Sequence, residues 1–503
     1  MTVAKTFSRA QVGVDAPLVT VEADVGSGLP QIVIVGLPET AVRESKDRVK
    51  SAILNSGYTL PSRRVTINLA PADLPKQGGR YDLAIALSIL AASDQISPEA
   101  IANQEFLGEL SLAGELRPVN GVLPAILASK NSQREITVPS ANGLEAGLTS
   151  DATVALAESL QQVINQIGGK IKPVRPVPAT NSYGEPSLIL DQVKGQYVAK
   201  NALIVAAAGG HNVLMMGPPG TGKTMLASRL PGLLPLPSEQ ESLEIASIQS
   251  VSRFNFQPAN WGARPFRNPH HTASAIALVG GGNPPLPGEI SLAHNGVLFL
   301  DELPEFSRHV LEVLREPMES GAIVISRANH QVNYPARFQL ISALNPCPCG
   351  YYGDESGRCN CRQDQVEKYR NKISGPLLDR IDLHIQVPPL PKGTLASVNS
   401  NNGSIEQQTA MNKIETARRR MLNRSGKLNA HLTSGETESF CHLTQTDRAM
   451  LDEVMYKLGM SARGFYKVLK IARTLADLAG EKRVARPQII EALAYRKASI
   501  RQS

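Results

Sequence analysis

The sequence predicts an α/β protein of about three domains, in which a central parallel sheet follows an α+β domain and precedes a helical one. Length is the first indication, because 503 residues exceed one hydrophobic core and a domain averages roughly 150 residues. Composition is the second: Lys172–Pro178 is proline-rich, and 388–404 is rich in turn-forming residues. These breaks predict domains at 1–170, 187–390 and 405–503, with linkers at 171–186 and 391–404.

The N-terminal domain mixes both kinds of secondary structure. Apolar and β-branched runs predict strands at 31–35 and 64–68, and helical spacing predicts helices near 38–56 and 82–93. The mixture, without a visible internal repeat, is typical of an α+β domain. In the last hundred residues the apolar spacing is helical almost throughout, which predicts a small helical bundle.

The central domain contains a glycine-rich loop between a predicted strand and a predicted helix. The apolar run 212–216 precedes the loop, the helix begins near Met225, and 217–224 fits the pattern G-x-x-x-x-G-K-[ST]. Small residues let backbone N–H groups surround a polyphosphate, Lys223 reaches its β and γ phosphates, and Thr224 offers a hydroxyl to Mg²⁺. The loop therefore predicts binding of ATP with Mg²⁺ through Gly217, Pro218, Pro219, Gly220, Thr221, Gly222, Lys223 and Thr224.

Two further strands are expected to deliver polar side chains to the same sheet edge. The strand 296–300 ends in Asp301, a ligand for Mg²⁺, and Glu302, which would orient and deprotonate the attacking water. The strand 338–344 ends at Asn345, whose amide is predicted to hydrogen-bond the γ-phosphate or the water. The alternative for Asn345 is an ordinary turn residue before a proline.

Net charge, apolar runs and cysteine content restrict the cellular location and the binding partners. The net charge of +7 and the pI of about 9.1 permit a polyanionic partner and support it only weakly. The first residues lack the apolar core of a signal peptide, and the longest apolar run, 202–208, is too short for a membrane span. Five cysteines in so long a chain argue against a disulfide framework. A cytoplasmic protein without a membrane partner is expected.

Four cysteines form two C-x-C pairs separated by nine residues: Cys347, Cys349, Cys359 and Cys361. Four soft ligands in a short loop, in a reducing compartment, fit a tetrahedral structural Zn²⁺. The glycines between the pairs would let the loop fold around the ion. The alternative is a group of reduced thiols, and Cys441, alone in the sequence, is expected to be structural.

These motifs, together with 266–272, 300–303, 377–382 and 461–463, resemble the AAA+ ATPases, in the branch shared by magnesium-chelatase ATPase subunits and MCM-type helicases. The resemblance extends from about residue 190 to the end and implies an AAA+ P-loop core with a C-terminal helical lid. It also implies that Arg380 is an arginine finger entering a neighbouring subunit's site, and that Arg463 is a sensor in the lid. Such sites exist only between protomers, so a homohexameric ring is implied.

The N-terminal third resembles the ComM-type competence proteins, also called magnesium-chelatase-like or YifB-type, in 34–38, 68–76 and 114–121. That family implies an ATP-driven helicase for branch migration of DNA in homologous recombination, as in natural transformation. Two alternatives remain: a chelatase motor that inserts Mg²⁺ into a porphyrin, and an ATP-dependent protease or chaperone.

Residues 75–85 resemble the segment of Lon-type proteases that carries the catalytic serine. The serine position holds Arg80, and the segment matching the lysine-bearing helix, 121–129, contains no lysine before Lys130. Since a Ser–Lys dyad needs both groups, a proteolytically inactive Lon-protease-like (S5-like) domain is predicted. In this domain Lys76, Arg80 and Arg117 would contact phosphates or be solvated surface charges.

Two inserts in the core are candidates for contacting DNA. A predicted hairpin before the Asn345 strand carries Arg327 and His330, and the segment 261–287 carries Arg264 and Arg267. The adjacent histidines 270 and 271 are interpreted as polar loop residues rather than metal ligands. The basic cluster 418–427 is predicted to be a solvated face of a lid helix.

Overall fold

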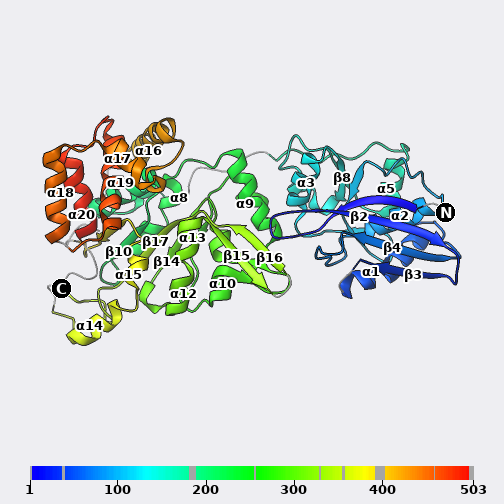
Figure 1. Cartoon of the computed structure of the whole chain (residues 1–503), viewed down its shortest axis with the longest axis horizontal. Helices are drawn as coiled ribbons and strands as arrows, with labels where there is room; N and C mark the ends of the chain where they lie inside the picture. The colour runs from blue at the N-terminus through cyan, green and yellow to red at the C-terminus, as the bar shows by residue number, and fades with distance from the viewer. Residues whose placement is uncertain are drawn as a thin grey trace.

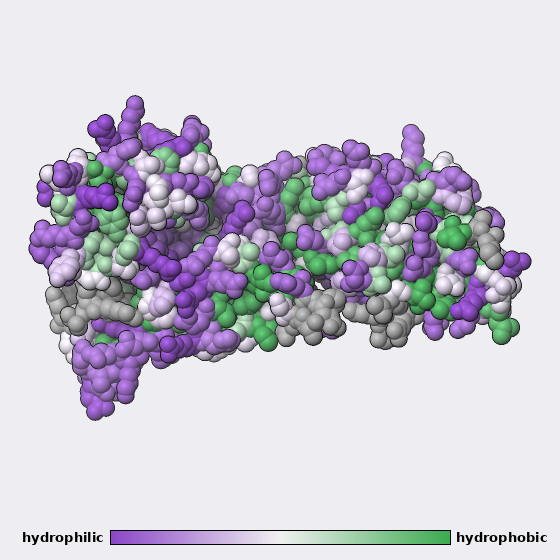
Figure 2. Space-filling model, viewed as in Figure 1, coloured by the Kyte–Doolittle hydropathy of each residue, from purple (hydrophilic) through white to green (hydrophobic). Residues whose placement is uncertain are grey.

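The computed structural model describes residues 3–36, 40–179, 189–253, 256–327, 330–353, 357–390, 403–457 and 459–497. The molecule is elongated, with the N-terminal domain at one end, the C-terminal helices at the other and the central α/β core between them (Figure 1). In the view of Figure 2 its surface is mostly hydrophilic, most densely around the protruding helix α14 (Gln363–Arg370). Among the described residues, no helix combines the length and apolar character that crossing a bilayer requires.

The N-terminal domain is a mixed sheet of seven strands in the order β3-β4-β2-β1-β5-β8-β9. The pairs β1/β2 and β2/β4 are antiparallel, and the other neighbours are parallel. Its strands are β1 (Val3–Arg9), β2 (Leu18–Gly26), β3 (Gln31–Val35), β4 (Arg64–Ala70), β5 (Gln104–Phe106), β8 (Glu135–Pro139) and β9 (Val154–Ala157). Its longer helices are α1 (Thr40–Asn55), α2 (Asp82–Ala92), α3 (Val122–Asn131) and α5 (Leu160–Ile167). The predicted strands and helices are therefore present.

Part of the expected first linker belongs to the N-terminal domain. Val174 forms a β-bridge with Leu156, and the N–H of Ala179 donates to the carbonyl of Gly147 at 2.8 Å. Because these backbone groups are paired with the domain, residues 171–179 pack onto it. Residues 180–188, the rest of the predicted linker, lie outside the described residues.

The core is a five-stranded sheet in the order β11-β14-β17-β10-β18, parallel throughout. Its strands are β11 (Phe266–Arg267), β14 (Val297–Leu300), β17 (Gln339–Leu344), β10 (Val213–Met216) and β18 (Leu383–Gln386). Strands β14, β17 and β10 are almost wholly apolar and buried, as expected when helices cover both faces of a parallel sheet. All carboxyl ends meet at one edge, where the glycine-rich loop follows β10.

Alternate residues of each strand pack into different cores. One face packs against α6 (Tyr197–Gly209) and the lid, and the other against shorter helices and the β15–β16 hairpin. The hairpin predicted before the Asn345 strand is present. The core's remaining elements include α7 (Lys223–Ala227), α8 (Leu230–Leu233), α9 (Glu239–Val251), α10 (Ala275–Val279), α11 (Glu289–Leu292), α12 (Arg308–Val313), α13 (Arg315–Ser320), β15 (Ala322–Arg327), β16 (His330–Pro335) and α15 (Gly375–Leu378).

The lid is helical, as the apolar spacing predicts. It consists of α16 (Gly403–Ser425), α17 (Ser434–Cys441), α18 (Gln445–Lys457), α19 (Ala462–Ala479) and α20 (Arg486–Lys497). The prediction that its basic cluster is solvated holds for Arg419 and Lys427, whose side chains are exposed. It is wrong for two other members: Arg418 Nε donates to the carbonyl of Ala207 at 2.9 Å, and Arg424 pairs with Asp477 at 2.8 Å. Burial lowers the pKa of Arg418 to about 10. These arginines anchor the lid internally.

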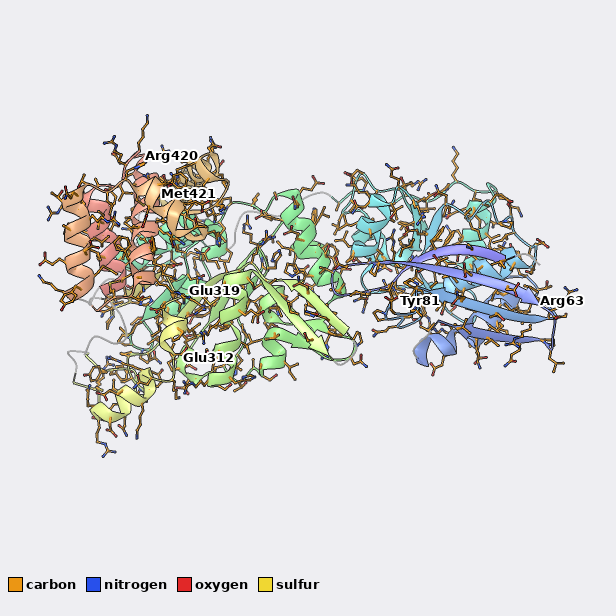
Figure 3. All side chains as sticks on the ribbon, viewed as in Figure 1. Arg63, Tyr81, Glu312, Glu319, Arg420 and Met421 are labelled. Atoms are coloured by element: carbon orange, nitrogen blue, oxygen red, sulfur yellow. The ribbon has the colours of Figure 1, made fainter. Side chains whose placement is uncertain are left out.

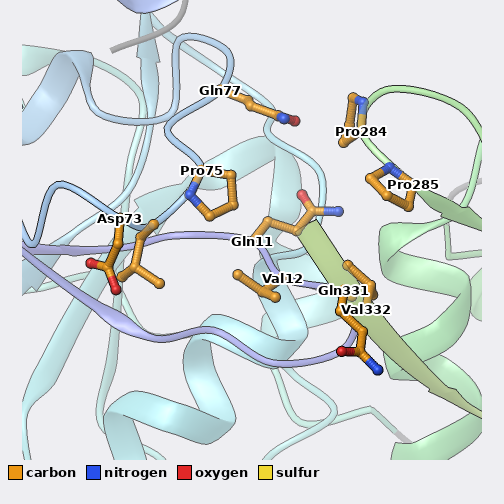
Figure 4. A pocket seen from close by; sticks show the side chains of 11 residues that line it. Gln11, Val12, Asp73, Pro75, Gln77, Pro284, Pro285, Gln331 and Val332 are labelled. Atoms are coloured by element: carbon orange, nitrogen blue, oxygen red, sulfur yellow. The ribbon is translucent and has the colours of Figure 1, made fainter. Parts of the chain in front are cut away.

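The N-terminal domain contacts the core at two places. Helix α3 packs on α9 through an apolar cluster that includes Leu123 and Trp261, and the N–H of Gly121 donates to the carbonyl of Ser250 at 2.9 Å. A second contact joins the turn at Gly13 to Val332 of the hairpin, since a Cβ on Gly13 would lie 2.5 Å from Val332 Cγ1. Figure 4 shows the pocket beside this second contact, lined from both domains.

Candidate active site

The glycine-rich loop has the backbone that its sequence predicts. It leaves β10 at Met216 and enters α7 at Lys223, with positive φ at Gly220 (+76°) and Gly222 (+89°). At Gly217 a Cβ would lie 2.2 Å from the carbonyl oxygen of Val387, so only glycine fits. The loop and the start of α7 therefore present backbone N–H groups at the carboxyl edge of the sheet.

Lys223 is the buried cation of this loop. Its side-chain Nζ donates to the carbonyls of Gly217 (2.8 Å) and Pro218 (2.9 Å) and to Asn345 Oδ1 (3.1 Å). Burial lowers the pKa of Lys223, while the carboxylates of Asp301 and Glu302 oppose that shift. These three acceptors are uncharged, so the negatively charged oxygens of a phosphate would bind the ammonium more strongly than they do. The surroundings of Lys223 therefore fit a phosphate site.

The two carboxylates after β14 have different surroundings. Asp301 Oδ2 accepts from Thr224 Oγ1 at 2.6 Å, which places two oxygens of the kind that Mg²⁺ prefers side by side. Glu302 has a left-handed backbone (φ +51°), uncommon outside glycine, and its Oε2 lies 3.1 Å from His271 Nδ1. His271 is a polar loop residue, as expected, but its contact with Glu302 is an addition that the sequence analysis does not contain. No spacing in the sequence indicates this pair.

The guanidinium groups of Arg380 and Arg463 both lie near the carboxylate of Glu319. Glu319 Oε1, at the end of α13 (Figure 3), is 2.6 Å from Arg380 Nη2 and 4.0 Å from Arg463 Nη2. The carbonyl of Arg380 accepts from the side chain of Asn212, just before β10 (3.4 Å). Arg380 is thus at the amino edge of the sheet, separated from the glycine-rich loop by the length of β10, about 13 Å at roughly 3.3 Å per residue. Neither arginine reaches Lys223 of its own chain.

A buried ion pair that the sequence analysis missed connects the lid to this edge. Lys467 Nζ lies 2.6 Å from Asp382 Oδ1, and Asp382 Oδ2 accepts from the N–H of Asn212 at 3.0 Å. Burial by itself would raise the pKa of Asp382, but Lys467 and His211 lower it well below its usual range. Because Lys467 is on the same helix as Arg463, the pair joins the elements that carry both arginines.

The predicted thiol cluster forms. The four Sγ atoms of Cys347, Cys349, Cys359 and Cys361 lie within 4.8 Å of one another, and three of their separations are 3.3, 3.6 and 3.9 Å. A tetrahedral zinc with Zn–S bonds of about 2.3 Å needs sulfur separations of about 3.8 Å. A backbone N–H from Tyr351 is the main reason that the pKa of the Cys349 thiol falls to about 6. The set fits one tetrahedral metal ion. Cys441 is buried in the lid.

Comparisons with known proteins cover the chain in three parts. The family described as subunit ChlI of Mg-chelatase matches residues 21–142, magnesium chelatase subunit ChlI matches 189–395, and its C-terminal region matches 405–496. Competence protein ComM of Haemophilus influenzae is 49% identical over 99% of this chain and 98% of its own length. The chain belongs to the ComM/YifB family of magnesium-chelatase-like AAA+ proteins.

Two further relatives are similar to this chain at lower identity. Protein YifB of Escherichia coli is 47% identical over 99% of this chain and 97% of its own, and the chloroplastic magnesium-chelatase subunit ChlI of Oryza sativa subsp. indica is 24% identical over 72% and 84%. Membership of this AAA+ family implies ATPase activity with ATP and Mg²⁺. The parallel core and the C-terminal helices agree with that assignment.

Another residue that the sequence analysis missed, Gln196, orders the phosphate loop. Gln196 has a left-handed backbone (φ +54°), and its side-chain Nε2 donates to the carbonyls of Thr221 (3.2 Å) and Pro388 (2.8 Å). It therefore ties the loop to the chain that leaves β18. A polar residue before α6 is too common a signal to reveal this from the sequence.

Two of the four DNA-contact candidates are committed to internal ion pairs. Arg264, with 9% of its side chain exposed, pairs with Glu241 at 3.1 Å. Arg267 makes a bidentate pair with Glu289 at 2.6 and 2.7 Å. Arg264 is nearly buried, so the prediction that it contacts DNA is corrected. The side chain of Arg267 is 32% exposed, so its contact with DNA stays a prediction in which a phosphate would have to displace Glu289. The side chains of the other two candidates, Arg327 and His330, lie outside the described residues.

In the N-terminal domain, two proposed phosphate contacts are buried. Lys76 is fully buried, its Nζ donates to the carbonyl of Pro71, and burial lowers its pKa. Arg80 donates to the carbonyl of Asn120 at 3.1 Å, and burial lowers its pKa as well. Neither is available to DNA. Arg117 is exposed and lies 3.7 Å from Glu109.

Proposed function

We propose that this protein is an ATP-driven DNA motor, a homohexameric ring that drives branch migration in homologous recombination, as in natural transformation. The observation that carries the ATPase part is the convergence of Lys223, Asn345, Thr224 and Asp301 at one sheet edge. Similarity over almost the whole chain to a protein named for competence supports the DNA part.

In this proposal the backbone of 217–224 and the ammonium of Lys223 hold the phosphates of ATP. Thr224 and Asp301 would hold Mg²⁺, which would supply positive charge beside the transferred phosphoryl group. Glu302 accepts a proton from the attacking water, His271 orients Glu302, and the amide of Asn345 contacts the γ-phosphate or the water.

The positions of Arg380 and Arg463 support a ring. Both lie at the amino edge of the sheet, and the phosphates of the same chain would lie at the carboxyl edge. A neighbouring subunit that presents its amino edge would supply the cations that complete the site. Glu319 holds Arg380 at 2.6 Å in the single chain, so the phosphates of a neighbour would compete with this carboxylate for the arginine.

Four finer assignments accompany the proposal. The N-terminal domain is a Lon-protease-like domain without proteolytic activity, supported by a buried Arg80 at the position of the serine. The four thiols hold a structural Zn²⁺, supported by their separations. The hairpin β15–β16 contacts DNA, supported by its place before the Asn345 strand. The protein acts in the cytoplasm.

The test is purified protein with ATP and Mg²⁺ on a synthetic four-way DNA junction, beside a Lys223→Ala control. Wild type should convert the junction into duplexes, and the variant should bind DNA without doing so. A wild type that hydrolyses ATP but neither binds nor converts the junction overturns the DNA motor. Stimulated insertion of Mg²⁺ into a porphyrin would then favour the chelatase alternative. Metal analysis should give about one zinc per chain, and a metal-free native protein would overturn the zinc assignment.

A further inference from the structure

The four-cysteine loop touches the phosphate loop. Gly350, between the first two cysteines and the second two, has φ +87°, and a Cβ placed there would lie 2.5 Å from Cδ and 2.7 Å from Cγ of Pro219. Pro219 is inside the loop that precedes Lys223. No side chain larger than hydrogen fits between the two loops without moving one of them.

The same loop is joined to the nucleotide site on its other side. Asn345, whose Oδ1 lies 3.1 Å from Lys223 Nζ, is separated by one residue from the fully buried Cys347. Arg370, at the end of α14, donates from Nε to the carbonyl of the intervening Pro346 at 3.3 Å. Its guanidinium also lies over the ring of Tyr352, 5.1 Å from the centroid. The cysteine loop thus adjoins both Asn345 and the phosphate loop.

We propose that the four-cysteine loop, closed by a tetrahedral metal ion, is a brace for the phosphate loop, so that the affinity for ATP depends on the metal and on the contact between Gly350 and Pro219. A metal bonded to all four thiolates cross-links residues 347–361 and removes their conformational freedom. Without that cross-link, nothing covalent holds Gly350 against Pro219. The inference rests on the proposed ATP site and does not depend on the DNA substrate.

The loop supplies its own matched controls. Gly353 (φ +80°) and Gly357 (φ +64°) also have left-handed backbones, but a Cβ at either position has no atom of the described residues within 4 Å. Alanine therefore adds similar backbone strain at all three glycines and a collision with Pro219 at Gly350 alone. A difference between Gly350→Ala and Gly357→Ala isolates the contact from the strain.

The experiment measures zinc content and binding of a fluorescent ATP analogue, with Mg²⁺, on the full chain. Gly350→Ala should keep its zinc and bind the analogue about tenfold more weakly, a loss of about 1.4 kcal/mol, because the collision displaces Pro219 in the loop that holds the phosphates. Gly357→Ala should bind like wild type. Cys361→Ser, and wild type stripped of metal by a chelator, should lose affinity, and zinc added back to the stripped wild type should restore it.

Equal affinity of wild type and Gly350→Ala, or of metal-loaded and stripped wild type, overturns the brace. If Gly350→Ala also loses its zinc, the comparison of stripped with zinc-reloaded wild type decides: equal affinity for the ATP analogue overturns the brace, and higher affinity after reloading supports it. A wild type that binds no ATP overturns the proposed function and the brace together. Binding that responds to zinc, with no activity on DNA junctions, overturns only the DNA motor.

Discussion

Replacing Lys467 with methionine should loosen the lid, because it leaves the carboxylate of Asp382 buried without its partner. The two side chains are only 17% and 10% exposed, and their charged atoms are 2.6 Å apart. Methionine keeps the length and apolar stem of lysine, so the change removes mainly the charge. The substitution therefore tests the ion pair that connects α19 to the segment carrying Arg380.

The expected loss in the free energy of unfolding follows from the burial of the ion pair. Removing one partner of a buried ion pair typically costs about 3–5 kcal/mol. The N–H of Asn212 still donates to Asp382 at 3.0 Å, and His211 Nδ1 lies 3.7 Å away, so we expect the lower end, about 3 kcal/mol. At about 2–4 °C per kcal/mol for a domain of this size, the melting temperature of the core and lid should fall by about 6–12 °C.

The assay is thermal unfolding near pH 7, followed by calorimetry, with Lys457→Met as the control. Lys457 pairs with Glu453 at the same 2.6 Å, but their side chains are 69% and 66% exposed. Such an exposed pair contributes about 0–1 kcal/mol, so the control should melt within a few degrees of wild type. Asp382→Asn combined with Lys467→Met should recover part of the loss, because the double variant has no buried charge at the pair.

Acid should reduce the difference between wild type and Lys467→Met. Since Lys467 and His211 hold the pKa of Asp382 below its usual range, the ionised carboxylate stabilises the fold above the unfolded pKa of about 3.9. That contribution to wild type falls only as the pH drops below this value. In Lys467→Met the lysine no longer opposes the burial that raises the pKa of Asp382, so the variant's carboxylate protonates at a higher pH and the difference should narrow as the pH is lowered from 8. Melting of Lys467→Met within two degrees of wild type, or a double variant less stable than the single one, would refute the reasoning.

Two further predictions concern turnover. Arg380→Ala should abolish most ATP hydrolysis. Mixing this variant with Lys223→Ala should restore part of the activity, because some sites in a mixed ring contain both an intact Lys223 and an intact Arg380 from the neighbour. If mixing restores no activity, Arg380 does not act between subunits. His271→Ala should lower kcat about tenfold with little change in the KM for ATP, because it removes the contact that orients Glu302. His270→Ala removes a ring that packs on His271, with centroids 4.2 Å apart, and contacts Thr272 at 2.9 Å, so its effect on kcat should be smaller. A change confined to KM would contradict a role of His271 in orienting Glu302.

Much of the fold and part of the site could be predicted from contiguous residues. Buried parallel strands are apolar runs of four to six residues, and three of the core's five strands were found for that reason. The glycine-rich loop was found because its conformation depends on glycines at set intervals, and the thiol cluster because two C-x-C pairs share one loop. These are local properties, so the order of residues reveals them.

The sequence by itself therefore determined the phosphate loop, the carboxylates that end β14 and the four thiols. Only the tertiary structure decided which charges meet across the fold: that Arg264 and Arg267 pair with Glu241 and Glu289, that His271 lies against Glu302, and that Lys467 is buried on Asp382. An isolated arginine or histidine has the same sequence signal whether it faces solvent or a carboxylate. Its partner is distant in the chain, and only the packing of the elements that carry both side chains brings them together.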